Sequence, residues 1–219
     1  MSFRATVLRR SWPFVFLLGL FTAPAAFGQA ANSPVVFANE SAVTTSFVTA
    51  PNEGGTAGPG GGGGNNQWLK VEFHYGIKPP LGNYQNEVQF KVWIEGRDLL
   101  DPQGKPGEGI AVALTGGVTY VNIPAGRDLY GVVYVHPSTL GRYSTGGGYE
   151  DFDRKFDIHI EADVDGKTMD YINKNKEADP QGWFKSLKVV PNLIYQQNQC
   201  AFILADVDRY PAIKGTAAQ

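Results

Sequence analysis

Hydrophobic and polar residues alternate along two stretches in the middle of the chain, residues 69–75 and 88–95, with Trp93 at a polar position of the second. A period of two is typical of β-strands that bury one face and expose the other. Antiparallel sheets have such faces, whereas parallel sheets are usually apolar on both sides. The two stretches therefore predict antiparallel strands.

Further short strands are predicted between turn signals. They cover residues 110–114, 118–123, 129–135, 156–163, 168–172, 183–190 and 200–207. Asp165-Gly166 is a pair that type I′ hairpin turns favour, because both residues tolerate positive φ. Residues 138–143 fit one helical turn, and a short helix over 169–177 is an alternative to the strand at 168–172.

Many short strands, frequent Gly and Pro turns and no long helix together predict an all-β fold. The expected architecture is an antiparallel β-sandwich, immunoglobulin-like, with a flexible N-terminal segment. The Cys…Trp…Cys core of antibody domains is absent, because the chain has one cysteine. The immunoglobulin likeness is therefore one of architecture alone.

The N-terminus has the layout of a secretory signal peptide. Three arginines precede an acid-free apolar run over residues 11–27, and small residues follow at 26–28. A retained membrane anchor is the alternative, but the run contains two prolines and is shorter than the roughly 20 residues a span needs. We expect residues 1–28 to be a signal peptide and the mature protein, which starts near Gln29, to be secreted, periplasmic or on the cell surface. No second long apolar stretch predicts a transmembrane span.

Residues 29–66 form a separate N-terminal segment. Residues 35–37 and 46–48 fit short strands or disorder, and residues 52–66 are rich in glycine. Such a stretch behaves as a flexible coil with a root-mean-square span of about 20 Å. It is either a linker that holds residues 67–219, the predicted β-sandwich domain, away from a surface or partner, or a long loop within the domain.

Charge and cysteine content narrow the function classes. Residues 1–28 contain three Arg and no acid, so the mature chain keeps 16 of 19 basic residues against 21 acidic ones, a net charge of −5. A mildly acidic surface argues against a nucleic-acid partner. Cys200 leaves no disulfide to stabilise an exported domain, and its apolar neighbours predict a small buried hydrophobic residue.

Candidate chemistry is sparse. His74, His136 and His159 lie too far apart for a zinc motif, and alternation places His74 and His159 on the polar face. The acidic stretches 150–153, 163–166 and 206–208 lack the calcium-loop spacing, although acidic loops at one end of a sandwich could share a cation. No serine-nucleophile or phosphate-loop motif occurs. We expect no enzyme activity, no cofactor and no metal.

Aromatic residues are the remaining candidates for a binding site. Trp93 lies on the polar side of its strand, and Tyr143 and Tyr149 flank the Gly-rich residues 144–148. Exposed aromatics can stack on sugars or anchor a protein partner. The alternative is that another strand or the N-terminal segment covers Trp93.

The signal, the Gly-rich segment and residues 67–75, 86–95 and 155–166 resemble a family of secreted, pilus-associated immunoglobulin-like proteins of verrucomicrobial bacteria. The resemblance implies one β-sandwich domain, no enzymatic activity and a role in a pilus-like surface structure. Residues 29–38 depart from type IV pilins, because they do not form a long apolar helix. Another assembly contact is then needed, and donor-strand exchange by residues 34–48 is one physical possibility.

The leading hypothesis is a secreted, non-enzymatic surface protein that assembles with itself or with other pilus or surface proteins. The alternative is an extracellular binding module for a host glycan or protein, which would use Trp93, Tyr143 and Tyr149.

Overall fold

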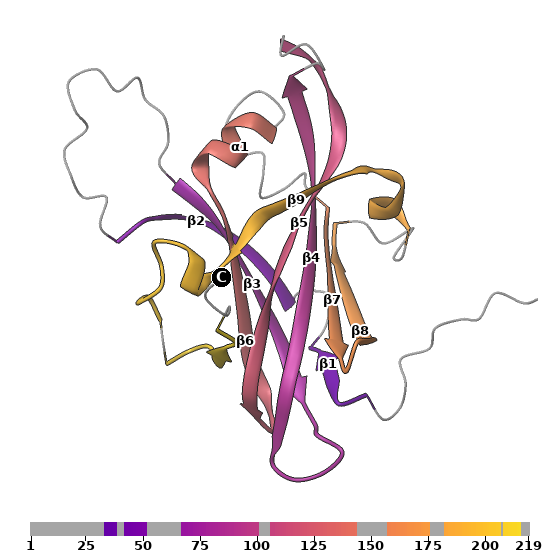
Figure 1. The fold of residues 1–219 in the computed structure, drawn as a ribbon, viewed down its shortest axis with the longest axis vertical. Coiled ribbons are helices and arrows are strands. Elements are labelled where there is room, and N and C mark those ends of the chain that lie inside the picture. Colours follow the sequence, from indigo (N-terminus) through magenta and orange to yellow (C-terminus); the bar gives the residue numbers. More distant parts are fainter. Residues whose placement is uncertain are drawn as a thin grey trace, which may run out of the picture.

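The computed structural model describes residues 33–38, 42–51, 67–100, 106–143, 157–175, 182–206 and 208–215. All the strands in these ranges belong to one sheet (Figure 1). The strands are β1 (Val35–Phe37), β2 (Val43–Thr49), β3 (Gln67–Ile77), β4 (Tyr84–Leu100), β5 (Pro106–Pro124), β6 (Gly126–Val135), β7 (Ile158–Val164), β8 (Lys167–Lys174), β9 (Lys188–Gln196) and β10 (Ala212–Ile213). The helices are α1 (Pro137–Tyr143) and the 3₁₀ turns η3 (Trp183–Ser186) and η4 (Gln197–Gln199).

The strand order makes the sheet mixed and nearly closed. It runs β1-β3-β6-β9-β5-β4-β7-β8, with β2 also paired to β3 and β10 also paired to β5. The β5–β9 pair is parallel, whereas the other strand pairs are antiparallel. Strands β1 and β8, which stand at the two ends of this order, contact each other. Figure 1 shows them side by side, so the sheet curls into a barrel-like shape.

The predicted antiparallel, immunoglobulin-like sandwich is therefore wrong. Strands β4 and β5 are long, and they pair almost from end to end. Through this ladder, one continuous sheet extends around the core. In a sandwich, the strands would instead be divided between two packed sheets. Alternation in the sequence identifies the buried face of each strand, but it does not identify the neighbours of that strand. Strand β9 lies between β5 and β6, which run in opposite directions, so it must be parallel to one of the two.

Several local predictions are confirmed. Strand β3 alternates between buried and half-buried residues over most of its length, Asp165 and Gly166 have φ of 50° and 73° at the β7–β8 turn, and α1 forms at the predicted helical turn. Residues 169–174 belong to β8, so the alternative helix is wrong. Residues 110–123 form one strand through Gly116 and Gly117, and residues 200–206 form turns where a strand was predicted.

Aromatic rings fill the inside of the barrel. Phe90 lies 4.8 Å from Phe73 and 4.7 Å from Tyr75, measured between ring centroids. Tyr120 is fully buried, and its hydroxyl accepts a hydrogen bond of 2.9 Å from the backbone N–H of Val132. This side chain bridges β5 and β6, which follow each other in the chain without pairing, and so satisfies a buried donor. Burial raises the pKa of Tyr75 and Tyr120 far above that of a free tyrosine.

We expect Gly116→Ala to destabilise the fold, because a Cβ at this position would overlap the carbonyl oxygen of Ile194 in β9. Backbone atoms cannot move aside as a flexible side chain can, so the loss should be about 1–3 kcal/mol or more. Gly141→Ala in α1 is the matched control, since its Cβ would meet no atom within 4 Å. Urea denaturation would measure both changes. Equal stabilities would contradict the close β5–β9 contact.

Candidate functional site

Strands β1 and β2 form an N-terminal arm, which we define as residues 33–38 and 42–51. The arm lies along the edge of β3 that faces away from β6. Strand β1 pairs with β3 from Val35 opposite Ile77 to Phe37 opposite Tyr75. Strand β2 continues along the same edge, and its last pair joins Thr49 to Gln67. The arm therefore covers this edge along almost the whole of β3.

The arm supplies part of the hydrophobic core. Val35, Phe37 and Val43 have 0%, 6% and 5% of their surface exposed. The Phe37 ring lies 6.3 Å from that of Phe73 and 6.0 Å from that of Phe90. A barrel without its arm would expose these rings to water, at a cost of about 1.5–3 kcal/mol for each large apolar side chain. The arm is thus required for a complete core.

A seam separates the arm from β8, the strand at the other end of the sheet. The successive strand pairings fix the direction of every strand in the sheet. They show that β8 runs in the same direction as β1 and β2. Among the described residues, no backbone ladder crosses this seam. Side chains join it instead: the backbone N–H of Phe37 donates to Asp170 Oδ2 at 2.8 Å, and Lys174 Nζ donates to Thr45 Oγ1 at 2.6 Å.

The connection between β2 and β3 is much longer than their geometry requires. Thr49 and Gln67 are cross-strand partners, so a two-residue turn would be enough to join the strands. The chain instead places residues 50–66 there, and the stretch 52–66 within this connection contains eight glycines. Closing a loop of this length in place of a two-residue turn costs roughly 2 kcal/mol of chain entropy. In return, the same stretch could extend to about 50 Å.

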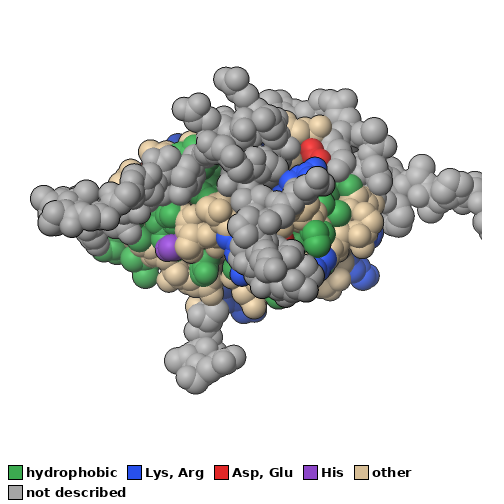
Figure 2. All heavy atoms as spheres, turned by 90° about the horizontal axis from the view of Figure 1, so that it is seen from above, with side chains coloured by type: hydrophobic (Ala, Val, Ile, Leu, Met, Phe, Trp, Pro, Cys, Tyr) green, Lys and Arg blue, Asp and Glu red, His purple; other side chains and the backbone are tan. Residues whose placement is uncertain are grey.

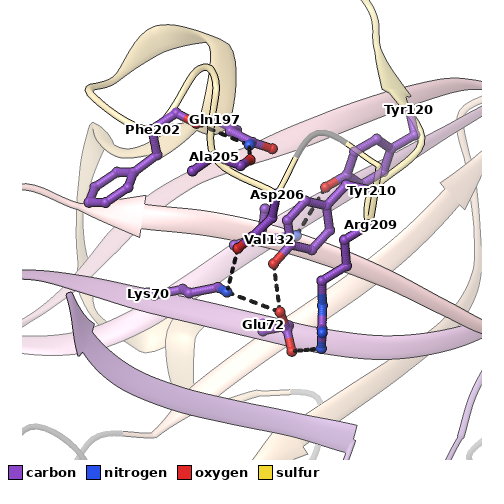
Figure 3. A network of polar contacts seen from close by, with 10 residues as sticks. All are labelled: Lys70, Glu72, Tyr120, Val132, Gln197, Phe202, Ala205, Asp206, Arg209 and Tyr210. Atoms are coloured by element: carbon purple, nitrogen blue, oxygen red, sulfur yellow. Dashed lines mark hydrogen bonds and ion pairs between the residues drawn. The ribbon is translucent and has the colours of Figure 1, made fainter. Parts of the chain in front are cut away.

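A C-terminal strap, residues 197–206 and 208–215, folds over the outer face of β3 and β6 (Figure 3). Glu72 of β3 is the centre of its polar contacts. The Glu72 carboxylate accepts hydrogen bonds from the Tyr210 hydroxyl at 2.6 Å and from Arg209 Nη2 at 2.7 Å. Lys70 Nζ lies 3.2 Å from Glu72 and 3.7 Å from Asp206. These groups clamp the strap to β3.

The clamp shifts the pKa of its acidic members. Partial burial tends to raise the pKa of Glu72, but the hydrogen bond from Tyr210 and the nearby Lys70 and Arg209 outweigh it and lower that pKa. Burial and the bond to Glu72 raise the pKa of the Tyr210 hydroxyl, so it stays protonated and donates. The Arg209 guanidinium also lies 4.4 Å from the centre of the Tyr130 ring.

A second, apolar contact holds the strap near its start. The Phe202 ring stacks on Tyr134, with 4.4 Å between centroids and 5° between planes. The Gln197 amide donates to the carbonyl oxygens of Phe202 and Ala205 and fixes the turn between them. Cys200 is half-buried in this turn, whereas the sequence predicted a buried residue within a strand. Burial raises the pKa of its thiol, which favours the protonated form.

Trp93 and Tyr143, the two predicted aromatic residues in the described part of the chain, pack against other elements. Trp93 is half-buried beneath η3, and its ring lies 4.6 Å from that of Phe184. Tyr143 is 5% exposed and packs from α1 against Gly96 of β4. Tyr149 lies outside the described residues. A binding role for these three aromatics stays a prediction.

His159 is buried, so its predicted place on the surface is wrong. The residue is on the outer face of β7, as alternation requires, but η3 folds over it and stacks Phe184 on its ring at 4.4 Å. Its Nδ1 lies 2.7 Å from Asn173 Oδ1. His136 lies on the surface beside α1, with its Nδ1 2.7 Å from Ser138 Oγ. In the described part of the chain, no three His, Cys, Asp or Glu side chains converge as a metal site would require.

Sequence reasoning missed the clamp because its members lie far apart in the chain. Glu72 and Tyr210 are separated by 138 residues, and the predicted strand at 200–207 placed the start of the strap inside the sheet. The one usable signal was the position of Glu72 on the polar face of a correctly predicted strand, because a carboxylate there needs a hydrogen-bond partner or water.

No described helix is both long and apolar enough to cross a membrane.

Comparison with known proteins places the chain in a family. A protein-family model matches residues 41–217, which span β2 to the end of the strap. The chain belongs to that family. Its fold is similar to a crystal structure of a protein from Akkermansia muciniphila, with a TM-score of 0.62 and 19% sequence identity. The match covers 83% of this chain and 93% of that chain, and at this identity it shows the fold alone.

That protein comes from a verrucomicrobium, so the predicted resemblance is confirmed as a likeness in fold to a verrucomicrobial protein. The pilus association stays a prediction. No curated protein has a significant sequence match to the chain.

We expect Glu72→Gln to loosen the strap at neutral pH, because the charged acceptor of three donors is lost. The loss in the free energy of unfolding should be about 1–2 kcal/mol, since Arg209 is half-exposed and its attraction is screened. The folded-state pKa of Glu72 is lowered, so its stabilisation is complete above the ordinary glutamate range and disappears as the pH falls below about 4.3. Stability curves of the two proteins should therefore converge in acid, and a difference that persists at low pH would contradict the clamp.

We expect Trp93→Ala to lower the free energy of unfolding by about 2–4 kcal/mol, because it removes the ring packed on Phe184 and His159. Tyr84→Ala is the matched control: Tyr84 is 61% exposed, and its loss should change stability by less than about 0.5 kcal/mol. Thermal and urea unfolding would measure both. A small loss in the free energy of unfolding for both variants would contradict the packing role of Trp93 and favour its role in binding.

Proposed function

We propose that the protein is an exported, non-enzymatic surface protein that works by assembling with other protein chains, as a component or accessory of a pilus-like structure. The observation that carries the proposal is the N-terminal arm. A two-residue turn could connect β2 of the arm to β3, but the chain uses residues 50–66 for this connection. This connection weakens closure of the arm on its own barrel and lengthens its reach, which favours contact with another chain.

The chemistry of the surface supports a protein partner. In the visible part of the face shown in Figure 2, Lys and Arg side chains lie among hydrophobic and neutral ones. Nucleic acids and anionic membranes are bound by continuous basic patches.

The secretory layout of residues 1–28 and the verrucomicrobial relative agree with this proposal. The binding-module alternative has less support, because Trp93 and Tyr143 are used in packing.

The test is made in the cells that produce the protein. Intact cells would be treated with protease and, separately, with a membrane-impermeant crosslinker, and the chain followed with an antibody. We expect the chain to be accessible from outside and to appear at multiples of the protomer mass or crosslinked to other surface proteins. A cytoplasmic protein such as a ribosomal subunit is the control for cell integrity. Protection from both reagents, or a crosslinked pattern of monomer alone, would overturn the proposal.

A further inference from the structure

We propose that the N-terminal arm inserts into a second copy of the same chain, so that β1 and β2 of one copy complete the barrel of the next. This inference rests on the proposed function and names the partner in it. The interface would be the edge of β3 together with the seam along β8.

Every contact that the arm makes within its own chain could be made between two copies. The arm is bound to the barrel through the β3 ladder, the seam and the core side chains Val35, Phe37 and Val43. Residues 52–66 are the covalent path by which the described arm continues into β3. An exchanged arm would therefore bury the same surface and form the same hydrogen bonds, as in domain swapping.

The two sides of the arm differ in how they are held. Along β3 the arm forms a backbone ladder that must be broken in one copy and rebuilt in another. Along β8 it is held by side chains, Asp170 to the N–H of Phe37 and Lys174 to Thr45. Such contacts break and form one at a time. The seam is therefore the side on which the arm can begin to leave or enter.

The arm also lacks the features that keep edge strands from pairing with other chains. Charged side chains on an edge strand oppose such pairing. Residues 35–50 contain one charged residue, Glu40, and are rich in the β-branched Val and Thr. Strand β8, on the other side of the seam, carries Lys167, Asp170 and Lys174. The arm is thus the element suited to entering a second copy.

Linker length sets the condition for exchange. For a linker of this length, the effective concentration of a tethered segment around its own binding site is in the millimolar range. Dilute protein should then keep its arm, and exchange should dominate where copies are packed more densely, as on a cell surface. Each copy has one arm and one acceptor edge, so exchange gives a reciprocal dimer, a closed ring or an open filament.

The register of β2 on β3 provides a direct test. Thr49 faces Gln67 across the arm–barrel boundary. Mature full-length chains carrying Cys200→Ala and either Thr49→Cys or Gln67→Cys would be mixed at about millimolar concentration, after brief exposure to mild denaturant, and then oxidised. In an exchanged assembly the two new cysteines come from different copies and form an intermolecular disulfide. We expect a crosslinked dimer that depends on mixing both chains.

The matched control uses Gln89 and Thr119, which face each other within the β4–β5 ladder of one copy. A mixture of Gln89→Cys and Thr119→Cys chains, also with Cys200→Ala, should give no crosslink above background. An equal yield from both mixtures, or no dimer from the Thr49 and Gln67 mixture, would overturn the exchange.

A second variant separates exchange from assembly as such. The double substitution Thr49→Cys/Gln67→Cys, oxidised as dilute monomer, locks the arm to its own barrel, and Gln89→Cys/Thr119→Cys is again the control. Light scattering at millimolar protein should show multimers of the control and monomers of the locked chain, with reduction restoring assembly. If the locked chain assembles equally well, exchange is wrong, whereas the proposed function is decided by the crosslinking on cells.

Discussion

Strand β3 hydrogen-bonds along both of its edges, to β6 on one side and to β1 and β2 on the other. This double pairing brings the N-terminal arm against the core and, through β1, brings the first strand of the sheet beside the last one. Without it, the edge of β3 would expose a row of unpaired backbone groups, and Phe73 and Phe90 would lose the ring of Phe37. The nearly closed shape of the sheet therefore depends on an N-terminal segment that is joined to β3 by a connection of 17 residues.

The outer face of β3 carries a different kind of contact. Glu72 holds the C-terminal strap through Tyr210, Arg209 and Lys70, on the side of the strand that faces away from the core. One strand thus organises both ends of the chain, the arm by its edge and the strap by its outer face. The two attachments differ in their main interactions: the arm depends mostly on backbone pairing and apolar burial, whereas the strap combines the charged contacts of Glu72 with the ring stack of Phe202 on Tyr134.

The proposed function depends on the N-terminal arm. Every copy of the protein needs an arm to complete its core. The contacts of the core are the same whether that arm comes from its own chain or from another copy. The residues that decide this question are those of the connection between Thr49 and Gln67, whose length the fold itself does not require. Selection for stability alone would shorten such a loop. In the proposed exchange, this length would let the arm reach a second copy.

The sequence by itself determined the local structure. Alternation identified the buried faces of β3 and β4, and the Asp165-Gly166 pair identified the β7–β8 turn, because these signals arise from neighbouring residues. Tertiary structure alone decided that the strands close into one mixed sheet, that η3 buries His159, and that Glu72 meets Tyr210. Those features depend on pairings between residues far apart in the chain. A period of two is the same whichever strand lies alongside, so the pattern leaves the partner of each strand open.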